Sequence, residues 1–151
     1  MSKNSPSIVS KNVVRNSNQR CIVIHNTNKV TIHDNVAFHT KGHCFSTETG
    51  LEVHNTFTRN LGAYGLKLAV GFGQSDTPGF STHHLAATFW IKSMMNTFVG
   101  NVAAGSVSMG FWFEMRDLNG NQLSKVPGSS SFRDNVAHSN FQGLVTYKKG
   151  W

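Results

Sequence analysis

The sequence predicts an all-β solenoid, a single-stranded parallel β-helix of about five to six coils, and three observations point to that fold class. An asparagine followed by a small or apolar residue recurs along the chain at intervals near 23 residues. Residues at fixed offsets from that asparagine stay apolar while the residues between them change. Short segments rich in β-branched and aromatic residues alternate with corners containing Asn and Gly, and no segment keeps a 3.6-residue period.

The candidate strands are short and rich in residues that favour extended structure. Because a fixed period places each residue above its counterpart one coil away, at about 4.8 Å, we expect these strands to stack in parallel. The clearest of them are CIVIH (21–25), KVTIH (29–33), ATFWI (87–91), GFWFE (110–114) and GLVTY (143–147).

The recurring asparagines are expected to line one corner of the solenoid. Stacked amides hydrogen-bond from coil to coil as a ladder, and the residue directly after each asparagine, usually Val, is expected to fill the core beneath the corner. The position three residues before each asparagine is apolar in every repeat except at Glu52. The five aligned asparagines are Asn12, Asn35, Asn55, Asn101 and Asn135.

The whole chain, residues 1–151, is expected to form a single β-helix domain with two insertions. These lie near 71–87 and 116–131, and the second has the Gly, Ser and Pro content of a loop. End coils of a solenoid expose unpaired strand edges unless something covers them, and neither terminal segment resembles a capping helix. We therefore expect a fragment of a larger protein, with further domains at both ends.

The charge of the chain favours an anionic partner. Its 14 Lys and Arg against 7 Asp and Glu give a net charge of +7, which suits an acidic polysaccharide, a nucleic acid or an anionic lipid surface. The basic residues are scattered without a Lys/Arg block, so no nucleic acid is expected. No apolar run approaches the roughly 18 residues of a membrane span, and the first ten residues lack the pattern of a secretory signal.

Cys21 and Cys44 occupy the same column of adjacent coils, 23 residues apart. Their α-carbons should then lie about 5 Å apart, which is within disulfide range. Two alternatives stay open from the sequence: a disulfide in an oxidising compartment, or two buried thiols that stack as small hydrophobic residues.

Two carboxylates share a column and are the candidates for catalysis. Glu48 and Glu114 each lie thirteen residues after an aligned asparagine, with Lys92 between them and His43 nearby. If one coil intervenes, the carboxylates lie about 9–10 Å apart, near the upper end of the range of inverting glycosidases. The alternative is a surface ladder of Glu, Lys and Glu that contributes little to stability.

Aromatic residues on successive strands are candidates for stacking on sugar rings. Alternation sends Phe111 and Phe113 to one side of the sheet and Trp112 to the other, with Trp90 on the preceding strand. Trp112 is expected either to be exposed or to lie beneath an insertion loop. The insertion near 71–87 adds His83 and His84 as candidate binding residues, and neither a metal site nor a cofactor is expected.

Several segments together resemble a known family. NVAFHTKGHCF, ATFWI, GNVAAGSVSMGFWFE and NVAHSNFQGL look like the β-helix of the cell-migration-inducing and transmembrane hyaluronidases and of the fibrocystins. The resemblance implies a right-handed parallel β-helix in an extracellular or cell-surface protein. At STETGLE this chain has Thr49 where the family usually has Asp.

The resemblance leaves two functions open. The hyaluronidase branch implies binding or depolymerisation of an acidic polysaccharide such as hyaluronan, which would make the domain a glycosidase that uses Glu48, Glu114 and His43. Trp90, Trp112 and Lys92 would then contact the substrate. The fibrocystin branch implies a non-catalytic scaffold or receptor solenoid that binds a glycan or a protein.

Overall fold

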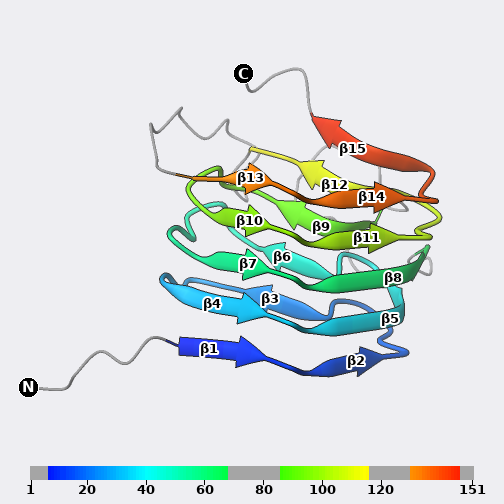
Figure 1. The fold of residues 1–151 in the computed structure, drawn as a ribbon, viewed down its shortest axis with the longest axis horizontal. Helices are drawn as coiled ribbons and strands as arrows, with labels where there is room; N and C mark the ends of the chain where they lie inside the picture. Colours follow the sequence, from blue (N-terminus) through cyan, green and yellow to red (C-terminus); the bar gives the residue numbers. More distant parts are fainter. Residues whose placement is uncertain (1–6, 68–85, 116–129, 147–151) are drawn as a thin grey trace, which may run out of the picture.

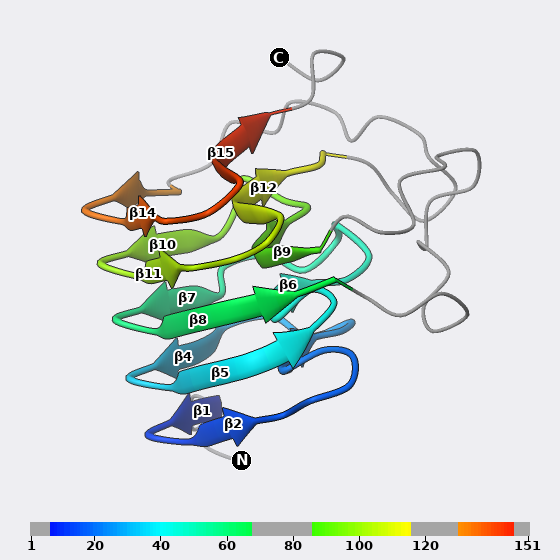
Figure 2. The ribbon, with the colours of Figure 1, turned by 90° about the vertical axis from the view of Figure 1, so that its right-hand side faces the viewer.

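The computed structural model describes residues 7–67, 86–115 and 130–146, and these form the expected right-handed parallel β-helix (Figures 1 and 2). Three parallel sheets of five strands enclose the core, and each of the five coils gives one strand to each sheet. The segments 68–85 and 116–129, which hold most of the two expected insertions, lie outside the described residues. Among the described residues, no helix is long and apolar enough to cross a membrane.

Each sheet collects every third strand of the chain, in order along the solenoid axis. The first sheet contains β1 (Ser7–Ser10), β4 (Val30–His33), β7 (Thr56–Thr58), β10 (Thr97–Val99) and β13 (Phe132–Arg133). The second contains β2 (Val13–Arg15), β5 (Val36–Lys41), β8 (Leu61–Leu66), β11 (Val102–Ala104) and β14 (Val136–His138). The third contains β3 (Ile22–Ile24), β6 (Phe45–Thr47), β9 (Ala87–Ile91), β12 (Met109–Phe113) and β15 (Gln142–Thr146).

An asparagine ladder runs along the first corner, where the first sheet turns into the second. In each step the backbone N–H and the side-chain Nδ2 of one asparagine donate to Oδ1 of the next, over distances of 2.9–3.1 Å. The Nδ2 of Asn60 also donates to the carbonyl of Ile32 in the neighbouring coil. The members of the ladder are Asn12, Asn35, Asn60, Asn101 and Asn135.

The expectation that Asn55 is the third rung was wrong, because Asn60 takes that place. Asn55 lies just before β7, where its Oδ1 accepts from the N–H of Val30 and its own N–H donates to Asn96, both at 2.9 Å. The coil from Asn35 to Asn60 spans 25 residues, whereas the coil from Asn12 spans 23. With Asn60 as the rung, Phe57 replaces Glu52 in the column three residues earlier, and that column becomes entirely apolar.

The residue directly after each rung faces outward, which corrects the expectation that it fills the core. Val13 is 74% exposed and Val136 is 49% exposed. The residue after that one faces inward, and Ala37 and Ala103 are buried there. The interior is filled instead by columns such as Phe45, Phe89 and Phe111, whose rings stack at centroid distances of 4.8 Å.

Both corners of the second sheet are made by residues with left-handed backbone conformation. At the first corner φ lies between 51° and 66° in every coil, directly before the asparagine rung. At the second corner, which leads from the second sheet toward the third, φ lies between 55° and 66°. The first column is Lys11, Asp34, Arg59, Gly100 and Asp134, and the second is Asn16, His39, Tyr64, Gly105 and Ser139.

A disulfide joins the first two coils. Cys21 and Cys44 are bonded, with their α-carbons 4.5 Å apart and 23 residues between them along the chain. Of the two alternatives left open by the sequence, the structure contains the disulfide. It lies next to the core column that begins with Ile22 and Phe45.

Replacing the central rung is expected to destabilise the fold. Asn60→Ala removes the acceptor for two donors of Asn35, and each buried group left without a partner costs roughly 1–3 kcal/mol. We expect the free energy of unfolding, measured by urea denaturation, to fall by about 3 kcal/mol. Asn18→Ala, at an exposed position outside the ladder, should change it by less than about 0.5 kcal/mol. Equal effects of the two substitutions would contradict the role of the ladder.

Reducing the disulfide is expected to lower stability without changing the fold. Opening a loop of this size should reduce the free energy of unfolding by about 3 kcal/mol. Denaturation curves with and without reductant measure the loss, and the mass should rise by two hydrogens after reduction. The double substitution Cys21→Ser with Cys44→Ser should match the reduced protein and no longer respond to reductant.

Candidate functional site on the third sheet

The structure brings the predicted catalytic and binding residues together on the outer side of the third sheet. The register of β6, β9 and β12 places Glu48, Lys92 and Glu114 at one level of three successive coils. Two coil steps separate the carboxylates by about 10 Å, at the outer limit of the spacing used by inverting glycosidases.

Glu48 is held by two basic side chains. Nη1 of Arg20 donates to Oε1 of Glu48, and Nδ1 of His25 lies 2.7 Å from Oε2. Arg20 also lies over the ring of Trp90, 6.0 Å from its centroid. Both oxygens of this carboxylate therefore have partners within the protein.

Glu114 and Lys92 meet at Trp90 in a buried environment. The indole Nε1 of Trp90 donates to Oε2 of Glu114 at 2.9 Å, and Nζ of Lys92 lies 4.7 Å from the indole centroid. Lys92 is 0% exposed and Glu114 is 4% exposed. A buried ammonium over an indole face is favourable because the ring face is negative, and the carboxylate nearby offsets the cost of desolvation.

His43 packs against the same tryptophan as a neutral imidazole. Its ring stacks on Trp90 with centroids 4.2 Å apart and planes 16° from parallel. Its Nδ1 accepts the backbone N–H of Ala87 at 3.0 Å. Burial, together with the positive charges of Arg20 and Lys92, lowers the pKa of His43 to about 3.

The two indoles face outward from the sheet but do not form an open surface. Phe111 and Phe113 belong to the interior cluster and Trp112 lies on the other side, as alternation predicts. Trp90 and Trp112 are only 2% and 5% exposed, with ring centroids 6.1 Å apart. Of the two alternatives for Trp112, the structure has the buried one, so neither ring presents an accessible face to a sugar.

The two histidines of the first insertion were the remaining candidate binding residues. His83 and His84 lie outside the described residues. Within residues 7–67, 86–115 and 130–146, no group of three or more His, Cys, Asp or Glu side chains is placed to hold a metal ion.

An exposed aromatic cluster at the second corner was missed from the sequence. The ring of Tyr64 stacks there on the rings of Phe38 and His39, and Phe38 and Tyr64 are 43% and 50% exposed. The choice of Asn55 as a rung concealed this column, because it shifted Tyr64 onto the cysteine column. A repeat aligned on Asn60 places Tyr64 above His39.

Comparison with known proteins identifies relatives over most of the chain. The chain is 33% identical over 161 aligned residues to the cell surface hyaluronidase CEMIP2 of Homo sapiens, covering 91% of this chain and 12% of that protein. It is 38% identical over 149 residues to a G8 domain-containing protein of Dictyostelium discoideum, covering 88% of this chain and 10% of that protein. Communication mutant protein F of the same organism is 39% identical over 109 residues, covering 66% and 10%.

These relatives are much longer than the chain, which spans 10–12% of their lengths. No solved structure matches the chain. The family model described as the CEMIP β-helix matches residues 1–144, which includes all five coils as far as the first half of β15. The chain therefore belongs to the CEMIP β-helix family.

Proposed function

We propose that this chain is an extracellular β-helix domain, part of a larger protein, that binds an acidic polysaccharide of the hyaluronan kind without cleaving it. The observation that carries the proposal is the distribution of charge. Among the described residues, three carboxylates are in ion pairs, those of Asp34, Glu48 and Asp134. The other two, Glu52 and Glu114, are buried and hydrogen-bonded.

The basic side chains, in contrast, are largely turned to solvent. Five of them have no carboxylate partner within the part of the chain that the structure describes, and all except the half-buried Lys41 are exposed. A surface with unpaired cations and paired anions attracts a polyanion, and the name of CEMIP2, a cell surface hyaluronidase, makes hyaluronan the first polyanion to test. The five are Lys11, Arg15, Lys29, Lys41 and Lys67.

The residues of the third-sheet site do not favour cleavage of the polysaccharide. A glycosidase needs one carboxyl group that can give a proton and a second that is free to act as base or nucleophile. Both oxygens of Glu48 already have partners, Arg20 and His25, and Glu114 is enclosed beside Trp90. A histidine whose pKa is lowered to about 3 does not act as an acid near neutral pH, which leaves His43 a packing role.

Depolymerisation is the second candidate, favoured by the name of CEMIP2 and by the shared column of Glu48 and Glu114. A non-catalytic scaffold that recognises a protein is the third, in line with the fibrocystin-like resemblance. Depolymerisation predicts that the polysaccharide becomes shorter, and a scaffold that recognises a protein predicts no retention on the polysaccharide.

The proposal is tested by measuring both the binding of hyaluronan and the length of the hyaluronan polymer after incubation. We expect the purified protein to be retained on immobilised hyaluronan in 50 mM salt and released near 1 M salt, because screening weakens contacts between exposed charges. Neutral dextran, the matched control polymer, should not retain it. Soluble hyaluronan recovered after incubation should keep its length on a sizing gel.

Two results would contradict this proposal. Absence of retention at low salt would remove the polysaccharide as partner. Shortened hyaluronan would make the domain a glycosidase, and the substitutions Glu48→Gln and Glu114→Gln would then show whether this column carries the reaction.

The state of His43 predicts how stability depends on pH. Because its folded pKa lies below the ordinary value near 6.5, the unfolded chain binds more protons than the folded one between about pH 3 and 6.5. Stability should therefore fall as pH decreases through that window. In His43→Gln this contribution disappears, so the difference in unfolding free energy between pH 7.5 and 5 should become smaller than in the native protein.

The exposed His54 provides the matched control for this experiment, since His54→Gln removes an imidazole that the fold does not bury. Imidazole NMR signals give a direct measurement. A His43 ring that titrates between pH 5 and 8 would show that the histidine is not held neutral in the fold.

A further inference from the structure

An exposed edge runs along the second corner and differs from the rest of the surface. We call it the second-corner edge, and its residues are Arg15, Phe38, His39, Lys41 and Tyr64. The rings of His39 and Tyr64 stack with centroids 5.4 Å apart and planes 15° from parallel. Phe38 lies 6.0 Å from Tyr64 at 19°. Nδ1 of His39 lies 2.9 Å from Oδ1 of Asn16 in the coil below, which supports the ring from beneath.

The next position above Tyr64 in its column is Gly105, which has no side chain. A Cβ at Gly105 would have only the backbone N and Cα of Tyr64 within 4 Å, at 3.8 and 4.0 Å. The face of Tyr64 that is turned away from His39 is thus not covered by a side chain of its own column. An aromatic face of this kind, held in place by a second ring behind it, is suited to stack on the C–H face of a sugar.

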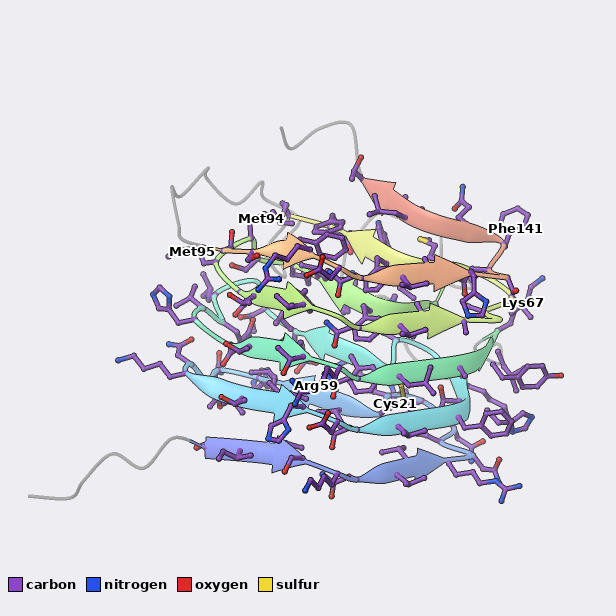
Figure 3. The ribbon with its side chains drawn as sticks, viewed as in Figure 1. Cys21, Arg59, Lys67, Met94, Met95 and Phe141 are labelled. Atoms are coloured by element: carbon purple, nitrogen blue, oxygen red, sulfur yellow. A yellow bond between two sulfur atoms is a disulfide. The ribbon has the colours of Figure 1, made fainter. Side chains whose placement is uncertain are left out.

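Cations lie along the same edge as this ring, in its own coil and in the two coils below, and no described carboxylate lies there. Arg15 pairs in register with Phe38, and Lys41 lies two residues beyond His39, with its Nζ donating to Asn18 at 3.2 Å. Lys67 follows β8 at the same edge, where Figure 3 shows it projecting on the same side as Phe141. All five described carboxylates lie elsewhere: at the first corner, on the outer side of the third sheet, and in the turn after β6.

We propose that the second-corner edge is where the acidic polysaccharide binds, with one sugar ring stacked on Tyr64 and carboxylates of neighbouring sugars paired with Arg15 and Lys41. This inference rests on the proposed function and adds a location to it. The first three coils extend about 10 Å along the axis, so a linear polymer aligned with the edge meets a cation or a ring in each of them. The buried cluster on the third sheet then has a structural role.

The arrangement favours a polysaccharide over a single-stranded nucleic acid. Proteins that bind single strands stack successive bases on separate aromatic side chains. Here His39 and Tyr64 stack on each other, which leaves one open face on their column. One open ring face with cations along the same edge, at Arg15 and Lys41 in the two coils below, matches a polymer in which every second sugar carries a carboxylate.

The experiment measures the dissociation constant of the folded chain for a defined hyaluronan oligosaccharide by calorimetry. Tyr64→Ala should weaken binding by at least tenfold, whereas Tyr64→Phe, which keeps the ring, should stay within about twofold. The pair Arg15→Gln with Lys41→Gln should weaken binding by about tenfold or more. The matched pair Lys11→Gln with Lys29→Gln removes the same charge from exposed positions elsewhere and should change binding by less than about threefold.

The outcomes separate this inference from the proposed function. If the native chain does not bind hyaluronan, both the proposed function and the assignment of the second-corner edge as the binding site are wrong. If the native chain binds while the Tyr64→Ala and Arg15/Lys41 variants bind equally well, only the location is wrong. If the two charge-removing pairs weaken binding equally, the oligosaccharide is attracted by the overall charge of the protein and not by the second-corner edge.

Two controls complete the design. An oligothymidylate that binds more tightly than the oligosaccharide at the same salt concentration would overturn the polysaccharide assignment. Urea midpoints measured for every variant confirm that binding is compared between folded proteins. Because Tyr64, Arg15 and Lys41 are exposed or half-buried, these midpoints should stay close to the native value.

Discussion

The asparagine ladder at the first corner is the interaction on which the other features of the structure depend. Each rung uses its backbone N–H, its amide hydrogens and its carbonyl oxygen to join adjacent coils, so a residue of different shape or polarity leaves donors unsatisfied in a buried place. Because the rungs are fixed one above another, the strands on either side are in register. That register places Phe45, Phe89 and Phe111 in one stack and Glu48, Lys92 and Glu114 in one column.

The same register explains why the third-sheet cluster is better suited to structure than to catalysis. Stacking unlike charges at a spacing of about 4.8 Å brings Glu, Lys and Arg close enough to neutralise one another. The indole of Trp90 joins that network by donating to Glu114 and by lying beneath Lys92, and His43 covers its face. Every polar group used there to satisfy another is one fewer group for a substrate. The exposed residues of the second corner have no such demands on them.

The fold class and the number of coils could be predicted from the sequence because the same asparagine and apolar positions recur in each coil along the solenoid axis. The exact register could not, because coils differ in length: two additional residues in the turn between β6 and β7 make Asn55 and Asn60 equally acceptable rungs by spacing. The apolar column provided a signal, since Phe57 fits it and Glu52 does not. The outward direction of the Val13 side chain depends on the left-handed corner before it. The burial of Trp112 depends on tertiary packing. Neither property follows from the alternation of residues alone.

The left-handed corners are shared by every coil and are occupied by glycine and by residues with large side chains alike. A residue with φ near +57° is strained unless it is glycine, and asparagine and aspartate tolerate that conformation better than bulky side chains do. Gly105 adopts this conformation at the second corner without strain, while Tyr64, one coil away with φ of 57°, does so with a large aromatic side chain. The ring adds little to the core, because half of its surface is exposed. Because His39 and Arg59 adopt the same conformation, the features that set Tyr64 apart are its exposed aromatic ring and its place below a glycine, and these support the proposed contact with a ligand.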